Sequence, residues 1–123
     1  MGPTIVVAED NQPFLSMLVS TLIMNGYSPV PAADGHEALL RVKESVTAAL
    51  LIDVSLPGIS GVRVVEVLRA QPEWQALPVI GMSGYDLPED EAELFTCFLH
   101  KPLVIAELLD HLKQLVHVPA HED

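Results

Sequence analysis

The sequence predicts a doubly wound α/β fold with a five-stranded parallel sheet in the order 2-1-3-4-5. Short apolar runs alternate with segments of helical periodicity, a pattern that specifies a parallel sheet covered by helices on both faces. One of these runs contains two prolines, which places it at an edge of the sheet. Charged and polar residues follow the other runs, at the edge where open α/β sheets bind their ligands.

The composition is that of one acidic domain. The 123 residues are enough for a single core, 50% of them are hydrophobic, and the formal net charge is −11. Nucleic acid and anionic membranes require basic patches, so this domain alone is a poor candidate for binding either. No apolar run approaches the ~20 residues of a membrane span, and no signal peptide is recognisable. We expect one domain over residues 1–118, a flexible tail over 119–123 and a cytoplasmic location.

The first predicted strand, residues 4–8, is β-branched and apolar, and Glu9 and Asp10 follow it directly. Residues 13–25 have apolar side chains at helical spacing, and Gly26 is suited to end that helix. The chain therefore begins as a strand, an acidic pair and a helix.

The second strand, within residues 27–32, contains the two prolines and is the predicted edge strand. Asp34 and Glu37 have the spacing of a capping box, which predicts a helix over residues 34–44.

The third strand, residues 49–52, is wholly apolar and reads as buried on both faces. It ends at Asp53, and prolines and glycines then turn the chain into a helix over residues 61–70. Trp74 follows in a linker, where we expect it to pack against a neighbouring helix end.

The fourth strand, residues 79–82, ends on Ser83 and Gly84. A helix is predicted after Pro88. A very short fifth strand, residues 98–100, ends on Lys101, and an amphipathic helix is predicted over residues 105–116. The single cysteine, Cys97, is expected to be a buried, inert thiol.

Five polar residues therefore follow four core strands at one edge of the predicted sheet: Glu9, Asp10, Asp53, Ser83 and Lys101. Taken singly, each has a structural explanation, as a helix cap, a turn hydroxyl or a solvated charge. Their joint placement indicates a functional site.

Three clustered carboxylates repel one another unless a cation lies between them, and hard oxygen ligands favour Mg²⁺. The residues suggest Asp10 and Asp53 as direct ligands, Glu9 as the holder of a metal-bound water, and a backbone carbonyl near Ser55 as a further ligand.

A carboxylate beside Mg²⁺ is also a potential nucleophile for phosphoryl transfer, and Asp53 is the predicted phosphoacceptor. The ammonium of Lys101 and the hydroxyl of Ser83 are suited to neutralise phosphoryl oxygens. Gly84 would allow a backbone N–H to approach those oxygens closely.

These residues resemble the receiver domain of two-component response regulators over nearly the whole chain. The resemblance is carried by Ala8-Glu9-Asp10-Asn11, Asp53-Val54-Ser55-Leu56-Pro57-Gly58-Ile59-Ser60-Gly61, Met82-Ser83-Gly84-Tyr85 and Lys101-Pro102-Leu103. It implies the flavodoxin-like (βα)5 fold. The predicted strand order is a known property of the family, so it is not independent support.

The resemblance implies a phosphoprotein of a two-component phosphorelay. A sensor histidine kinase or a histidine phosphotransfer protein would donate a phosphoryl group to Asp53, and Glu9, Asp10, Asp53 and the Ser55 carbonyl would hold Mg²⁺. Such a domain catalyses only its own phosphorylation and dephosphorylation, and it signals to an output domain or protein target. The resemblance also implies a switch, in which Ser83 moves toward the phosphoryl group and Phe98 turns inward; Phe98 as a plain core aromatic is the alternative.

Three features depart from the family pattern. The segment from Ser83 to Lys101 is shorter than usual by roughly one helical turn. Val104 stands where a polar helix cap is common. Tyr85 occupies a position that tunes dephosphorylation in the family.

Three other functions are compatible with parts of the sequence. A degenerate receiver would bind a partner without phosphorylation, and the short segment before Lys101 is its best support. A phosphatase of the haloacid dehalogenase type would require a second acid two residues after Asp53 to protonate the leaving group, but that position is Ser55. A flavodoxin-like carrier of flavin mononucleotide would require a phosphate-cradling loop after the first strand, and the sequence has no such loop there.

Overall fold

The computed structural model describes residues 2–117, which form a five-stranded parallel sheet in the order β2-β1-β3-β4-β5. The predicted fold class and strand order are confirmed. The strands are β1 (Thr4–Ala8), β2 (Ser28–Ala32), β3 (Thr47–Asp53), β4 (Val79–Ser83) and β5 (Cys97–His100). The predicted tail, residues 119–123, lies outside the described part of the chain.

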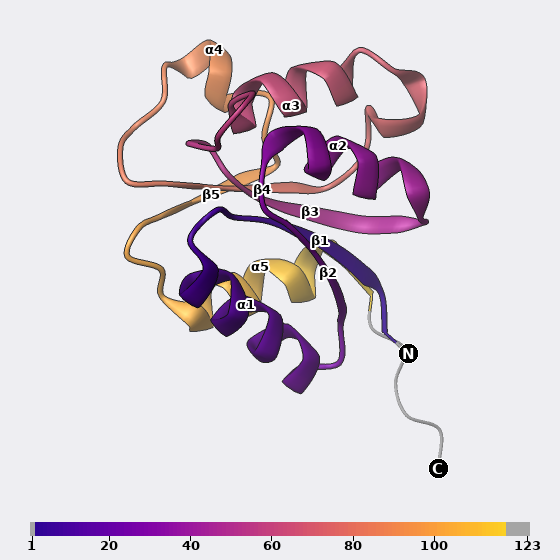
Figure 1. Cartoon of the computed structure of the whole chain (residues 1–123), viewed down its shortest axis with the longest axis vertical. Helices are drawn as coiled ribbons and strands as arrows, with labels where there is room; N and C mark the ends of the chain where they lie inside the picture. The colour runs from indigo at the N-terminus through magenta and orange to yellow at the C-terminus, as the bar shows by residue number, and fades with distance from the viewer. Residues whose placement is uncertain (1, 118–123) are drawn as a thin grey trace.

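Within residues 2–117, five α-helices and one short 3₁₀ helix cover the two faces of the sheet (Figure 1). Helices α1 and α5 lie on one face, and α2, α3 and α4 lie on the other. Their bounds are α1 (Gln12–Met24), α2 (Gly35–Glu44), α3 (Gly61–Arg69), η1 (Pro72–Trp74), α4 (Glu89–Ala92) and α5 (Ile105–Leu115). None of the helices in residues 2–117 has both the length and the apolarity that crossing a membrane requires.

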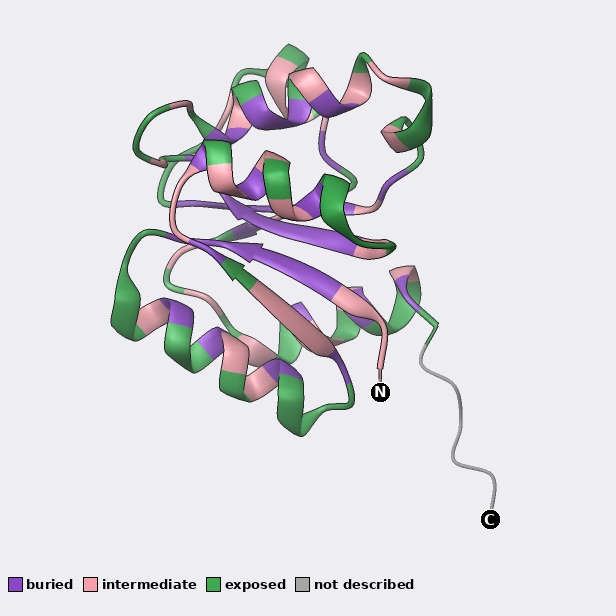
Figure 2. Ribbon diagram, turned by 45° about the vertical axis from the view of Figure 1, so that its right-hand side comes forward, coloured by how far each residue is buried: buried purple, intermediate pink, exposed green. Residues whose placement is uncertain are grey.

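Alternation along the strands divides the core into two layers. Ile5 and Val7 of β1 pack toward α1 and α5, whereas Val6 and Ala8 pack toward α2 and α3. The central strands β1, β3 and β4 are therefore buried on both faces, whereas the edge strand β2 is mostly half-buried or exposed, and the helices keep an exposed side (Figure 2). This double burial explains why the strands read as continuous apolar runs.

The helix starts show where local sequence controls the chain direction. Asp34 caps α2 by accepting the N–H of Glu37 at 2.8 Å. In a capping box, the Glu37 carboxylate would accept the N–H of the cap residue Asp34. Here it accepts the N–H of the preceding residue, Ala33, at 2.7 Å. Val104 precedes α5 without any side-chain cap, as its apolar side chain requires.

Two smaller predictions have different outcomes. Trp74 packs on the α2 and α3 layer as expected, and the ammonium of Lys43 lies 5.8 Å from its ring centre. Cys97 was predicted to be buried, but it is only half-buried. It lies near the end of the sheet, on the edge strand β5, where one side has no neighbouring strand.

Candidate functional site

Two carboxylates lie at the carboxyl end of β1. Glu9 is 1% exposed, and its side chain accepts the N–H of Asn11 and the ammonium of Lys101, each at 3.0 Å. Asp10 is exposed. Neither acid caps α1, because the side chain of Asn11 accepts the N–H of Phe14 at 2.9 Å and performs that role. Both carboxylates are thus free of the structural role that a helix cap would give them.

Asp53 is the last residue of β3, between β1 and β4 in the sheet. It is 5% exposed, and its Oδ1 accepts the N–H of Ser55 at 2.8 Å. Its Oδ2 accepts a hydrogen bond from the ammonium of Lys101. The bond to Ser55 fixes the start of the following loop, so the side chain and the loop are oriented together.

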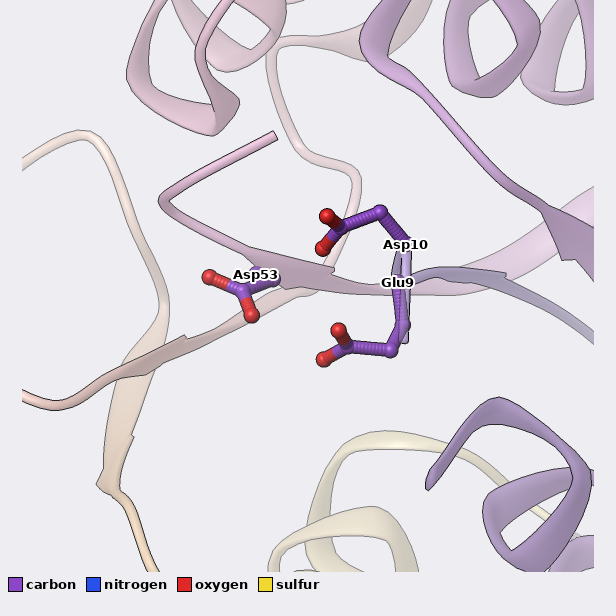
Figure 3. A group of neighbouring side chains, drawn as sticks. All are labelled: Glu9, Asp10 and Asp53. Atoms are coloured by element: carbon purple, nitrogen blue, oxygen red, sulfur yellow. The ribbon is translucent and has the colours of Figure 1, made fainter. Parts of the chain in front are cut away.

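The carboxylates of Glu9, Asp10 and Asp53 converge on one place (Figure 3). One oxygen from each lies within 4.8 Å of the others. The ammonium of Lys101 binds two of these carboxylates, those of Glu9 and Asp53, and Asp10 adds a third negative charge, so the site has excess negative charge. An all-oxygen donor set with excess negative charge fits a hard divalent cation such as Mg²⁺. The backbone carbonyl of Ser55 as a further metal ligand stays a prediction.

Lys101 joins three strand ends. Its backbone N–H donates to the carbonyl of Ser83 at 2.8 Å, and its ammonium binds Glu9 and Asp53. The same ammonium lies 5.1 Å from the centre of the Phe14 ring, a cation–π distance. In the sequence, Phe14 is only one of the apolar residues at helical spacing in the predicted helix over residues 13–25. Its proximity to Lys101 depends on how the first and fifth βα units meet in space, so no local sequence pattern indicates it.

Burial and pairing shift the ionisation of the site in known directions. Burial raises the pKa of Glu9, and the neighbouring Asp53 adds to this, against the opposing effects of the Asn11 N–H and Lys101. Burial disfavours the charged form of Lys101, but its bonds to Asp53 and Glu9 outweigh that effect and raise the pKa. The ammonium is therefore held charged, and the buried Glu9 carboxylate is left incompletely compensated.

Ser83 lies at the end of β4, on the same edge as Asp53, and is 1% exposed. Its hydroxyl donates to the carbonyl of Tyr85 at 2.6 Å and accepts the N–H of Tyr85 at 3.0 Å. The hydroxyl is thus committed to the loop that follows β4. Next to it, Gly84 has no atom within 4 Å of where a Cβ would lie. The backbone there is open to an approaching group, and a bond from the Gly84 N–H to a phosphoryl oxygen stays a prediction.

Phe98, the predicted switch aromatic, is half-buried on β5. Its ring lies 4.7 Å from that of Phe95, at an interplanar angle of 57°. Both rings pass close to Gly81, where a Cβ would lie 2.8 Å from Phe95 and 2.9 Å from Phe98. Gly81 therefore makes room for the aromatic pair. Phe95 was not predicted as part of this arrangement, because its ring meets that of Phe98 at Gly81 of the neighbouring strand β4, and a local sequence pattern does not show which residue of β4 lies there.

The shortened segment between Ser83 and Lys101 leaves α4 as a single turn of four residues. The guanidinium of Arg69 secures this segment by donating to the carbonyl of Leu94 at 3.0 Å, and also to the carbonyls of Trp74 and Leu77 at 2.8 and 2.7 Å. Arg69 was not predicted to have this role. Its partners are backbone carbonyls, and every residue has one, so the sequence does not indicate which carbonyls Arg69 binds.

Comparison with known proteins identifies the family to which this geometry belongs. The sequence profile of the response regulator receiver domain matches residues 5–113. The chain belongs to the receiver domain family. The acidic cluster, the lysine and the serine of this receiver domain thus lie at the edge of the sheet where the sequence placed them.

Curated relatives of this receiver domain are response regulators. The transcriptional regulatory protein PrrA of Mycobacterium tuberculosis is 31% identical over 119 residues, which is 94% of this chain and 50% of PrrA. The polar-differentiation response regulator DivK of Brucella suis is 24% identical over 117 residues, 92% of this chain and 95% of DivK. The chain thus spans about half the length of PrrA and nearly all of DivK.

Solved structures of receiver domains have the same fold. The chemotaxis protein CheY4 of Vibrio cholerae superposes with a TM-score of 0.86 at 26% identity, covering 94% of this chain and 100% of CheY4. The receiver domain of a sensor histidine kinase of Pseudomonas aeruginosa superposes with a TM-score of 0.85 at 27% identity, covering 94% and 98%. That structure has a magnesium ion coordinated in its active-site cleft.

Proposed function

We propose that this receiver domain accepts a phosphoryl group on Asp53 from a phosphohistidine, with Mg²⁺ as cofactor, and so acts in a two-component phosphorelay. The observation that carries the proposal is the convergence of Glu9, Asp10 and Asp53 within 4.8 Å, with Lys101 bound to two of the three. The magnesium-bound cleft of the Pseudomonas receiver domain supports the choice of metal.

The transfer exchanges one bond to phosphorus for another. A carboxylate oxygen of Asp53 attacks the phosphorus, the P–N bond to the donor imidazole breaks, and its electron pair leaves on the nitrogen. Lys101 neutralises charge on the phosphoryl oxygens, and the Ser83 hydroxyl and Gly84 N–H donate to them. Glu9, Asp10 and Asp53 would hold Mg²⁺, which would supply further charge neutralisation when bound.

The donor approaches through an open pocket beside the ammonium of Lys101. This pocket has a volume of about 340 Å³ and is lined by Asn11, Phe14, Lys101, Pro102 and Leu103. It lies between the start of α1 and the segment after β5, the two segments that flank the acidic cluster. A protruding histidine side chain of a kinase or phosphotransfer protein is suited to enter such a pocket.

The domain catalyses only its own phosphorylation and the later hydrolysis of its acyl phosphate. Tyr85 is 54% exposed on the loop after Ser83, and in this proposal its ring slows the entry of water to the acyl phosphate. Phosphorylation moves Ser83 toward the phosphoryl group and Phe98 inward, and a partner or output domain reads the change.

Intact-mass spectrometry after incubation with acetyl phosphate tests the proposal. We expect one phosphoryl adduct that requires Mg²⁺, is absent with a chelator and is absent from Asp53→Ala. The matched control Asp86→Ala removes an exposed aspartate outside the acidic cluster and keeps the adduct.

A receiver that binds its partner without phosphorylation is the second candidate, because α4 is reduced to a single turn. Absence of the adduct, together with failure of fluoroberyllate and Mg²⁺ to raise the unfolding temperature, would favour that candidate and overturn the proposal. Fluoroberyllate mimics the phosphoryl group without a transfer step, so it separates a slow reaction from a site that does not form.

A further inference from the structure

The ammonium of Lys101 faces an aromatic ring as well as two carboxylates. It lies 5.1 Å from the centre of the Phe14 ring. This is within the ~6 Å over which the negative face of an aromatic ring attracts a cation. Phe14 belongs to α1 and Lys101 follows β5, so the contact joins the two ends of the chain. Lys101 therefore has one partner whose charge does not change when Asp53 is phosphorylated.

A continuous set of bonds fixes this ring relative to the ammonium. The Glu9 carboxylate accepts the ammonium of Lys101 through Oε1 and the N–H of Asn11 through Oε2, each at 3.0 Å. The Asn11 side chain in turn accepts the N–H of Phe14 at 2.9 Å. These contacts begin and end at Lys101, so the backbone that carries the ring is tied to the same carboxylate that binds the ammonium.

The ring lies at a helix end that repels cations. The free N–H groups at the amino end of an α-helix give that end a partial positive charge. The first turn of α1 has no acidic residue that would offset this charge. The negative face of the Phe14 ring offsets part of the repulsion at the point where the ammonium of Lys101 meets α1.

Lys101 also borders the open pocket beside the site, which has a volume of about 340 Å³. Its side chain is 29% exposed, and the four-carbon stem of a lysine is flexible. Phosphorylation spends the negative charge of the Asp53 carboxylate, so one of the two carboxylates that hold the ammonium attracts it less. Of the residues that line the pocket, Phe14 is the aromatic one, and its ring keeps the ammonium from turning outward.

We propose that Phe14 is a positioning residue for the phosphoryl transfer proposed above, on which this inference rests. Its ring holds the Lys101 ammonium beside Asp53 while negative charge moves from the carboxylate to the phosphoryl oxygens. The ring takes no part in the bonds that form and break. It acts by keeping a charge-neutralising group in its productive geometry, which is a source of rate acceleration. The rate of transfer therefore depends on the electron density of the ring as well as on its size.

Fluorination of the ring tests the proposal with little change of shape. Phe14 is replaced in the full chain, by amber-codon suppression, with mono-, di- and trifluorinated phenylalanine, because each fluorine withdraws electron density from the ring face. Intact-mass spectrometry follows phosphorylation by acetyl phosphate with Mg²⁺. We expect the rate to fall with each fluorine, to about threefold to tenfold below the wild type for the trifluorinated ring and for Phe14→Leu. Phe14→Trp should retain most of the rate, because its ring also attracts a cation.

Tyr27 is the matched control for fluorination. It belongs to the same core layer as Phe14 but precedes β2, at the opposite end of the strands from the acidic cluster. The same fluorinated residues at position 27, compared with Tyr27→Phe, should leave the rate of phosphorylation unchanged. Unfolding temperatures measured for all variants show that each is folded.

An NMR measurement tests the contact without phosphorylation. Ring currents move the signals of protons above an aromatic face to higher field. The chain has three lysines, Lys43, Lys101 and Lys113, so isotopically labelled lysine gives three Cε signals that single substitutions assign. We expect the Cε protons of Lys101 at higher field than those of the exposed Lys113, and we expect Phe14→Leu to abolish this displacement. Lys43, which faces Trp74, is the internal control, and its signal should not change.

The outcomes separate this inference from the proposed function. A wild type that forms no adduct would overturn both. A wild type that reacts would overturn the role of Phe14 alone if fluorination at position 14 left the rate unchanged, if fluorination at position 27 had an equal effect, or if the Lys101 signal lay at the ordinary field. A loss of rate with a phosphohistidine donor but not with acetyl phosphate would assign Phe14 to contact with the donor protein, and would also refute the proposal.

Discussion

Glu9 combines two demands that conflict in a folded protein. Its carboxylate is 1% exposed, yet it must be ionised to take part in binding a cation. Its bonds to the Asn11 N–H and to Lys101 satisfy both oxygens, but burial still raises its pKa. The charged form therefore destabilises the fold, and a bound cation would relieve that cost.

The pH dependence of stability follows from this residue. Because the folded-state pKa of Glu9 lies above its ordinary value of 4.5, the stability that this group contributes is fully present below pH 4.5. It is lost as the pH rises through the raised pKa. In metal-free buffer, we expect the free energy of unfolding of the wild type, relative to Glu9→Gln, to fall between pH 4.5 and neutrality.

Urea denaturation of both proteins across this pH range makes the measurement. A difference in unfolding free energy that stays constant or grows with pH would show that the pKa of Glu9 is not raised.

A second prediction at the scale of one residue concerns the effect of Gly81→Ala on stability. An added Cβ would lie 2.8 Å from Phe95 and 2.9 Å from Phe98, so Gly81→Ala must displace two packed rings. We expect a loss of about 1–3 kcal/mol in unfolding free energy, measured by urea denaturation. Gly84→Ala is the matched control, because no atom lies within 4 Å of its added Cβ, and its effect should stay within about 0.5 kcal/mol. Equal effects of the two substitutions would contradict the packing account.

At the scale of the elements, the sequence predicted the five strands and the five α-helices, and the strand and helix bounds it gave differ from the structure by at most about two residues, as is usual for element ends. The short helix η1 was missed, because its residues were predicted to be a linker. The largest difference is at β3, which begins at Thr47, before the predicted start at residue 49. Thr47 pairs with Thr4 across a register shift, so a partner strand extends β3. A pairing of this kind depends on another part of the chain and is invisible to a local pattern.

Substitutions at the N-caps of α2 and α5 should change the free energy of unfolding in opposite directions. Asp34 caps α2 through the Glu37 N–H, so Asp34→Ala should lower the unfolding free energy by about 1 kcal/mol. Val104 has extended backbone, is 53% exposed and supplies no cap to α5, so Val104→Ser should raise it by about 0.5–1 kcal/mol. Thermal and urea unfolding of the two variants measure both changes. Destabilisation by Val104→Ser would show that the apolar contacts of Val104 outweigh the missing cap.

At the scale of the whole molecule, the parallel topology explains why the candidate site was predictable. All five strands point the same way, so the residues after β1, β3, β4 and β5 share one edge although they are far apart in sequence. Asp53 and Lys101 could therefore be placed together from the fold class alone. Phe14, Phe95 and Arg69 could not, because their contacts depend on packing distances and on backbone carbonyls.

Metal binding should stabilise the molecule as a whole. Excess negative charge at the cluster weakens the folded state, and a cation that binds only the folded state shifts the equilibrium toward it. At a Mg²⁺ concentration ten times the dissociation constant, we expect a gain of about 1.4 kcal/mol in unfolding free energy. Asp10→Asn should bind Mg²⁺ more weakly and show a smaller gain at the same concentration. An equal gain in both proteins would place the bound ion elsewhere.

The most direct test of the phosphoacceptor site is to locate the modified residue after incubation with acetyl phosphate and Mg²⁺. Borohydride converts an aspartyl phosphate to homoserine, and fragmentation mass spectrometry then reads its position in the chain. The account predicts homoserine at residue 53 alone, and none when Mg²⁺ is withheld. Homoserine at Asp10 or at any other acid, or its absence under all conditions, would contradict the central claim.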